Sequence, residues 1–95
     1  MCPYCNKPIS PKDEQAGNVG MFMETQCYHT FHVNCFKSYA TKVCLKYKRQ
    51  GTEPLFEDPR CGHCNVVVPE LETRMIIGAE YEMVENQRMQ IYLAA

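Results

Sequence analysis

The stretch CYHTFHVNC, residues 27–35, holds two cysteines and two histidines within nine positions. Cys27 and His29 are two positions apart, and in an extended segment such residues lie on the same face. His32 and Cys35 are three positions apart, which makes them neighbours on the first turn of a helix. We therefore expect these two pairs to bind two different metal ions.

Two further cysteine pairs flank this stretch, Cys2/Cys5 before it and Cys61/Cys64 after it, each with two residues between its members. A Cys-x2-Cys turn can direct two thiolates at one ion, and zinc takes thiolate and imidazole ligands in closed, tetrahedral structural sites. Eight donors in four pairs therefore predict two structural zinc ions. Each ion would be bound by one central pair and one flanking pair.

The length of the chain supports a role for metal in folding. With 95 residues we expect one domain, whose core alone would give only marginal stability. The seven cysteines are an odd number, and nothing in the sequence implies the oxidising compartment that disulfides need. Zinc bound by reduced thiols in a cytoplasmic or nuclear protein is the better interpretation.

Composition argues against several classes of protein. No apolar run approaches the ~20 residues of a membrane span, and the residues after Met1 do not form a signal peptide. The net charge of -1 argues against broad nucleic-acid binding. The sequence shows neither a Ser-His-Asp set nor a glycine-rich phosphate loop, so any activity should come from binding another protein.

The ligand order Cys-Cys-Cys-His-His-Cys-Cys-Cys resembles a RING finger of the two-histidine (H2) type over residues 2–68. One residue separates the third and fourth ligands and two separate the fourth and fifth, whereas the rival PHD finger has one histidine and a wider second gap. The resemblance implies a small zinc-stabilised α+β fold with a short β-hairpin and a central helix. The family's cross-brace implies one zinc on Cys2, Cys5, His32 and Cys35, and a second zinc on Cys27, His29, Cys61 and Cys64.

The central helix should run from Val33 to Gln50 and stop at Gly51. Its apolar stripe consists of Phe36, Tyr39, Ala40, Val43 and Tyr47. Residues 51–60 should return as a proline-rich loop, so that 36–60 form an extended helix and loop within a finger spanning 1–68. We expect a loop at 6–19 and short strands at 20–26 and 66–68.

Residues 69–95 should form a helical extension of the finger. Pro69 suits a helix start, and Gly78 weakens the prediction of a helix over 70–93. An apolar face contains Ile77, Tyr81, Val84 and Ile91. Packing on the chain's own core is the default expectation for this face, and dimerisation or binding of a partner helix are the alternatives.

RING fingers commonly act as ubiquitin ligases, and the resemblance implies that function here. The chain would bind a ubiquitin-conjugating enzyme charged with ubiquitin and position the thioester for attack by a lysine of an unidentified substrate, with no catalytic residue of its own. The family's contact positions fall on Tyr4, Tyr39, Gly62 and Asn65. Gly62 replaces a frequent proline and Asn65 a frequent Arg or Lys, which keeps open the alternative of a RING adaptor that assembles proteins without catalysis.

Two features lie outside this pattern. Cys44 is expected to pack as a small apolar residue, with a ubiquitin-accepting nucleophile as the sharper alternative. The helix region also carries five positive charges and no negative ones, at Lys37, Lys42, Lys46, Lys48 and Arg49. A solvated face is the favoured interpretation of these charges, and a docking surface for an acidic partner is the alternative.

Overall fold

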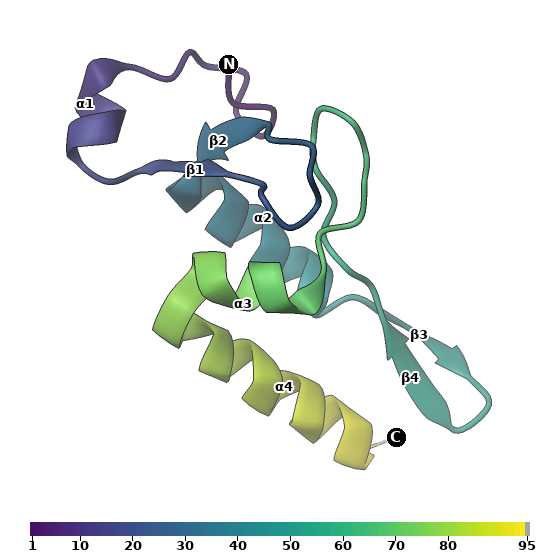
Figure 1. The fold of residues 1–95 in the computed structure, drawn as a ribbon. Helices are drawn as coiled ribbons and strands as arrows, with labels where there is room; N and C mark the ends of the chain where they lie inside the picture. Colours follow the sequence, from purple (N-terminus) through teal and green to yellow (C-terminus); the bar gives the residue numbers. More distant parts are fainter. Residues whose placement is uncertain (95) are drawn as a thin grey trace.

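A computed structural model describes residues 1–94 of the chain, which fold as a small α+β domain (Figure 1). The β1–β2 hairpin packs at the start of a central helix, α2, and a second hairpin follows that helix. Two further helices, α3 and α4, cover another side of α2. The elements are α1 (Pro11–Gln15), β1 (Val19–Met21), β2 (Thr30–His32), α2 (Val33–Cys44), β3 (Tyr47–Gln50), β4 (Glu53–Phe56), α3 (Glu70–Ile77), a 3₁₀ turn (Gly78–Glu80) and α4 (Tyr81–Ala94).

The loop expected at 6–19 contains the short helix α1. Ser10 caps it, because the Ser10 hydroxyl accepts from the Asp13 amide while the Asp13 carboxylate accepts from the Ser10 amide. Pro11 occupies the first turn, where its missing N–H costs nothing. The strand expected at 20–26 is shorter than predicted, since β1 ends at Met21. It pairs antiparallel with β2, with Gly20 opposite Phe31.

The central helix is shorter than the predicted 33–50, because α2 ends at Cys44 and residues 47–50 form strand β3. The expected loop at 51–60 therefore begins with a hairpin turn and strand β4. Gly51 is the turn residue, with a φ of +68° that glycine adopts without strain. Tyr47 leaves the helical stripe and faces Phe56 across the hairpin, with their ring centroids 5.7 Å apart.

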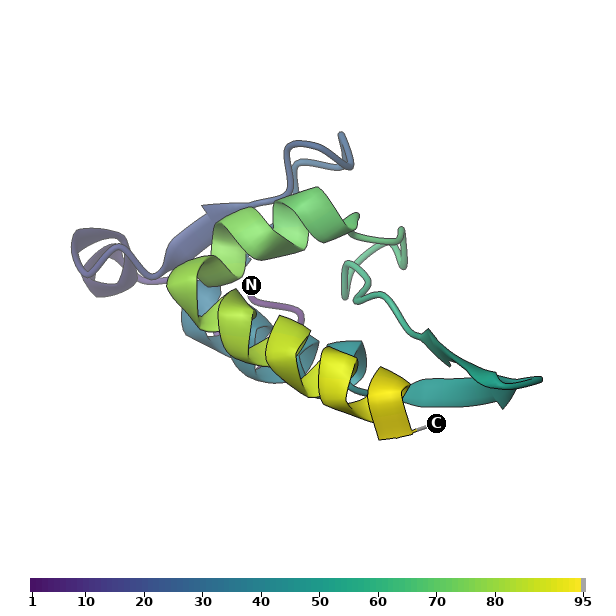
Figure 2. The ribbon, with the colours of Figure 1, turned by 90° about the horizontal axis from the view of Figure 1, so that it is seen from below.

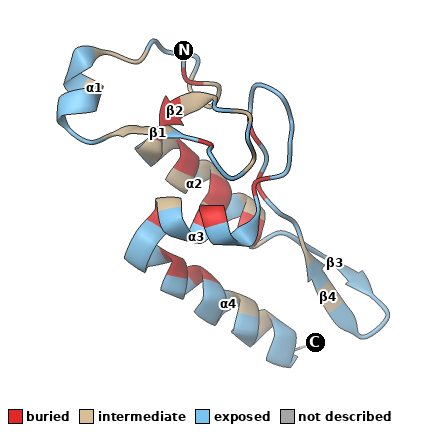
Figure 3. Ribbon diagram, in the orientation of Figure 1, coloured by how far each residue is buried: buried red, intermediate tan, exposed pale blue. Residues whose placement is uncertain are grey.

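The core is aromatic at the end nearest the two hairpin strands β1 and β2. Phe22, Phe31 and Phe36 are fully buried, with Phe22 stacked on Phe31 at 4.3 Å and edge-on to Phe36 at 5.3 Å. Gly20 allows this packing, because a Cβ there would stand 2.6 Å from the Phe31 ring. Figure 3 shows the buried residues along the facing sides of α2, α3 and α4.

The C-terminal region is two helices, not the single helix expected over 70–93. Gly78 ends α3 with a φ of +73°, and the chain turns there into α4. Ile77, Tyr81 and Val84 are buried, and both helices contact α2. The strand expected at 66–68 is limited to one bridge between Arg60 and Val67.

Figures 1 and 2 show the β3–β4 hairpin extending from the body of the molecule beside the C-terminal half of α4. Arg88 of α4 secures the base of this hairpin. Its Nε donates to the Cys44 carbonyl at 2.7 Å, its Nη2 donates to the Glu57 carbonyl at 3.3 Å, and its guanidinium lies over the Phe56 ring.

Candidate metal centres

The first candidate centre gathers Cys2, Cys5, His32 and Cys35, whose donor atoms all lie within 4.8 Å of one another. Cys2 and Cys5 come from the N-terminal turn, His32 ends β2, and Cys35 lies on the first turn of α2. Val19 pairs with His32 across the hairpin, and the His32 amide donates to Cys2 Sγ at 3.4 Å, which joins this strand end to the N-terminal segment. These are the four residues that the RING cross-brace assigns to one zinc.

Asp13 orients the imidazole of this centre. Its Oδ2 lies 3.0 Å from His32 Nε2, while His32 Nδ1 lies 3.2 Å from Cys5 Sγ. With Nε2–H donating to the carboxylate, the lone pair of Nδ1 points into the ligand set, which is the usual carboxylate support for a metal-bound histidine. The Ser10 amide and hydroxyl, followed by His32, lower the pKa of Asp13, so this carboxyl stays ionised.

The thiols of the first centre differ in how readily they ionise. Burial opposes ionisation of Cys2, but amides of His32, Tyr4 and Cys5 outweigh it and lower its pKa to about 7. Burial, then hydrogen bonding and repulsion from the neighbouring Cys5 and Cys2 sulfurs, raises the pKa of Cys35 to about 11. A bound divalent ion removes this conflict, because it stabilises every thiolate of the set together.

The second candidate centre gathers Cys27, His29, Cys61 and Cys64, again with all donor atoms within 4.8 Å of one another. Cys27 and His29 lie in the loop between β1 and β2, and the other two bracket a turn after β4. His29 Nδ1 lies 3.5 Å from Cys61 Sγ. This centre is nearer the surface than the first, since Cys64 is exposed and only Cys61 is buried, whereas the first set has two buried ligands, Cys2 and His32.

Two neighbours support the second centre. Burial opposes ionisation of Cys27, yet the Thr25 hydroxyl, 3.1 Å from its sulfur, and groups of His29 lower its pKa to about 7. His63 lies between the two ligands of the turn, and its ring packs on His29 with centroids 4.8 Å apart. His63 Nε2 is 3.1 Å from the Met1 carbonyl, so this side chain also links the turn to the N-terminus.

Glu72 of α3 holds the loop that leads into Cys27. Its carboxylate is buried and accepts from the amides of Met23, Glu24 and Thr25 at 2.8, 3.3 and 3.2 Å. A carboxylate with three amide donors is well compensated for its burial. The C-terminal helices therefore take part in positioning the second ligand set.

Both ligand sets fit zinc. Each offers three thiols and one imidazole, the donors that closed structural zinc sites use, and no carboxylate belongs to either set. The sets interleave along the chain, because the second set's Cys27 and His29 lie between the halves of the first. The central segment 27–35 is thereby connected to both the N-terminal turn and the 61–64 turn.

Tyr4 and Tyr39, two expected contacts for a conjugating enzyme, stack on each other with ring centroids 4.8 Å apart. Tyr4 Oη donates to the Arg60 carbonyl at 2.8 Å, and the Arg60 amide donates to Tyr39 Oη at 3.0 Å. Burial, then the Cys61 thiol, raises the pKa of Tyr4 well above its usual value. Both rings thus fasten the second zinc loop to α2, and their exposed edges remain on the surface.

The backbone and its surroundings favour the residue types found at Gly62 and Asn65. A Cβ on Gly62 would lie 2.6 Å from the Pro3 Cβ, so only glycine fits beside the N-terminal loop. Asn65 has a φ of +63°, a left-handed conformation that asparagine adopts more readily than arginine. The Asn65 carbonyl accepts from the Arg60 guanidinium at 2.9 Å.

Cys44 is buried against the C-terminal helices, and burial raises the pKa of its thiol. This environment suits an apolar packing role and disfavours a thiolate nucleophile.

Asp13 and Glu72 were not identified from the sequence. The Ser-x-x-Asp capping box at 10–13 was a visible signal for the first, while nothing local marks Glu72, whose partners lie 47 to 49 positions away.

The fold and the two ligand sets define a small α+β domain of the zinc-binding class. Comparisons of the chain with models of protein families, with curated proteins and with solved structures find no match. Within residues 1–94, no helix has both the length and the apolar character to cross a membrane.

Proposed function

We propose that this chain is a RING-type ubiquitin ligase module. It binds two structural zinc ions, recruits a ubiquitin-conjugating enzyme carrying ubiquitin, and promotes transfer to a lysine of a substrate protein. No covalent intermediate forms on the chain, whose contribution is to hold two reactants in a productive arrangement. The thiolates that bind zinc suit a cytoplasmic or nuclear setting, where thiols stay reduced.

One observation carries the proposal: a shallow groove lies between the N-terminal loop, which carries Tyr4, and the central helix α2, beside the first ligand set. The groove has a volume of about 630 Å³ and runs along α2 from Tyr4 past Tyr39 and Val43. Partly buried aromatic and aliphatic side chains beside exposed polar ones form the kind of surface that binds a protein loop.

A substitution of Tyr4 does not test the groove alone, because Tyr4 also holds the second zinc loop through Arg60. Tyr4→Ala removes groove surface and the hydrogen bond to Arg60, so its zinc content must be measured beside its activity. Ser38→Arg is the cleaner change, because Ser38 is exposed on α2 and lines the groove. A bulky side chain there should block an incoming loop. The zinc content of this variant is measured as well, because the ligand Cys35 lines the same groove one helical turn away.

Autoubiquitination of the zinc-loaded chain against a panel of conjugating enzymes tests the proposal. We expect chain formation with at least one enzyme, and loss of at least about tenfold in rate for Ser38→Arg, equivalent to 1.4 kcal/mol. Asn65→Arg should raise the rate, because arginine adds a charge and further donors that asparagine lacks. Absence of ubiquitin chains and of NMR shifts with every enzyme would overturn the ligase proposal.

A non-catalytic RING adaptor is the second candidate function. The observation that favours it is the uncharged side chain of Asn65 at the position where ligases of the family often carry Arg or Lys. In that case conjugating enzymes would fail to bind while the zinc-loaded chain still captured a protein partner through the groove. Ser38→Arg would then abolish that capture, and neither the native chain nor the variant would support ubiquitin transfer.

A further inference from the structure

The groove along α2 carries an unbalanced positive charge. Lys42 and Lys46 line it, four positions apart on the helix side that continues into the loop before β3, and both are exposed. No carboxylate lines the groove. Across residues 1–94 neither lysine forms an ion pair, since the ion pairs present join His32 to Asp13 and Arg74 to two glutamates.

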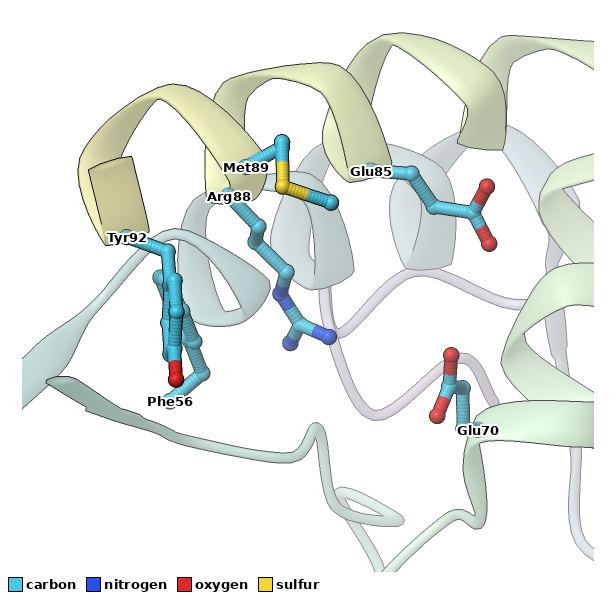
Figure 4. A pocket seen from close by; sticks show the side chains of 6 residues that line it. All are labelled: Phe56, Glu70, Glu85, Arg88, Met89 and Tyr92. Atoms are coloured by element: carbon cyan, nitrogen blue, oxygen red, sulfur yellow. The ribbon is translucent and has the colours of Figure 1, made fainter. Parts of the chain in front are cut away.

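The other large hollow, between β4, α3 and α4, is electrostatically different. Figure 4 shows Glu70 and Glu85 at one end of it, Phe56 and Tyr92 at the other, and the Arg88 side chain between them. Arg74 donates to both glutamates, and Arg88 is bound to two carbonyls. The charges there are satisfied within the chain, whereas Lys42 and Lys46 form no ion pair among residues 1–94. Glu80 borders a neighbouring hollow with Lys42, outside the groove lining, and it does not pair with the lysine.

The groove therefore combines an apolar floor with a cationic edge. Val43 and the tyrosine rings provide the floor, and Lys42 and Lys46 stand beside it. A partner that fits must insert an apolar side chain and place carboxylates opposite the two lysines. Charge complementarity of this kind speeds association and discriminates among related partners more than it adds raw affinity.

We propose that Lys42 and Lys46 select, among ubiquitin-conjugating enzymes, those whose docking loops carry acidic side chains beside an apolar one. This inference rests on the proposed ligase function and specifies its partner. Enzymes with basic docking loops would be repelled at the same edge. The lysines thereby act as determinants of specificity, while the tyrosines shape the floor.

The test measures binding directly, because removing lysines could also remove ubiquitin acceptor sites and confuse an activity assay. The zinc-loaded full chain is titrated with conjugating enzymes that carry acidic or basic docking loops, by calorimetry and by amide NMR shifts. The double variant Lys42→Glu/Lys46→Glu should bind the acidic-loop enzymes at least about tenfold more weakly. It should bind the basic-loop enzymes more tightly than the native chain does.

Lys48→Glu/Arg49→Glu is the matched control. It changes the net charge equally, and both residues are exposed on β3, outside the groove. We expect this control to bind within about twofold of the native chain, and both variants to retain two zinc ions. Native binding to acidic-loop enzymes should also weaken as salt is raised, because exposed charges are screened.

Three outcomes would overturn the inference. If the Lys42/Lys46 variant binds acidic-loop enzymes as the native chain does, while Ser38→Arg abolishes binding, the selection fails and the ligase proposal stands. If both double variants weaken binding equally, net charge and not the groove is responsible. If no conjugating enzyme binds the zinc-loaded chain at all, the ligase proposal and this inference fail together.

Discussion

Single side chains outside the ligand sets decide how firmly the ligands are held. Asp13 fixes the orientation of His32, and Glu72 gathers three amides of the loop before Cys27. Both are carboxylates that accept hydrogen bonds, and both reach a zinc loop from a different element. Loss of such a supporting side chain typically lowers metal affinity by about 10- to 100-fold.

Glu72→Gln should destabilise the zinc-loaded chain by about 1–3 kcal/mol. The amide oxygen can still accept from Met23 and Glu24, but the amide nitrogen then faces the Thr25 N–H, and a buried donor loses its acceptor. The thermal midpoint should fall by several degrees, and the NMR shift of the Thr25 amide should move most. Glu82→Gln, at an exposed position in the first turn of α4, is the control. Equal midpoints for the two variants would contradict the role of Glu72.

At the scale of elements, the sequence was informative where ligand spacing or a local cap applied. The short hairpin before α2 was implied by the RING resemblance, and the start of α2 at Val33 follows from the apolar stripe and from the spacing of His32 and Cys35. The end of α2 did not, because the apolar stripe continues to Tyr47. Pairing of Tyr47 with Phe56 and the glycine turn at Gly51 outweigh helical periodicity there.

The C-terminal helices show the same limit of sequence analysis. Of the predicted apolar face, Ile77, Tyr81 and Val84 are buried, while Ile91, near the end of α4, is only partly buried. The break at Gly78 was visible only as a weakness in the predicted helix, since glycine is compatible with both a continuous helix and a turn. The four donor pairs were recognisable from their spacing, and their division into two sets was what the RING resemblance implied. Asp13 and Glu72 depend instead on tertiary contacts.

Tyr81, buried at the start of α4, should make the free energy of unfolding fall at alkaline pH. Burial raises its pKa to about 12, with Arg88 acting in the opposite direction, while the unfolded chain has the ordinary value near 10. The folded state thus keeps the phenol neutral after the unfolded state has begun to ionise. The contribution of Tyr81 is complete below pH 10 and is lost as pH rises from about 10 to about 12.

Tyr81→Phe removes this titration. The variant should be less stable than the native chain at neutral pH, since it loses the bond of the hydroxyl to Glu70 at 3.4 Å. The difference in the free energy of unfolding between the native chain and Tyr81→Phe should then become smaller above pH 10. Denaturant midpoints of both proteins from pH 8 to pH 11 measure it. Parallel curves for the two proteins across that range would show that the Tyr81 phenol ionises equally in both states.

At the scale of the whole molecule, the two ligand sets share one segment of the chain. Residues 27–35 contribute to both, and β2 within that segment carries the buried Phe31. Loss of either ion should therefore loosen the loop, the β1–β2 hairpin and the aromatic packing together. A structural zinc site contributes on the order of 10 kcal/mol to folding, which exceeds what the remaining core of a domain this small can replace.

Cys64→Ala tests this connection, because Cys64 is exposed and its loss removes a ligand without opening a cavity in the core. The variant should lose the second zinc and also hold the first at least about tenfold more weakly, as measured by chelator competition and elemental analysis. Cys44→Ala is the control, since it removes a buried thiol outside both sets and should retain two zinc ions. A Cys64→Ala protein that keeps one zinc with native affinity would show instead that the two centres fold independently, in spite of the segment that they share.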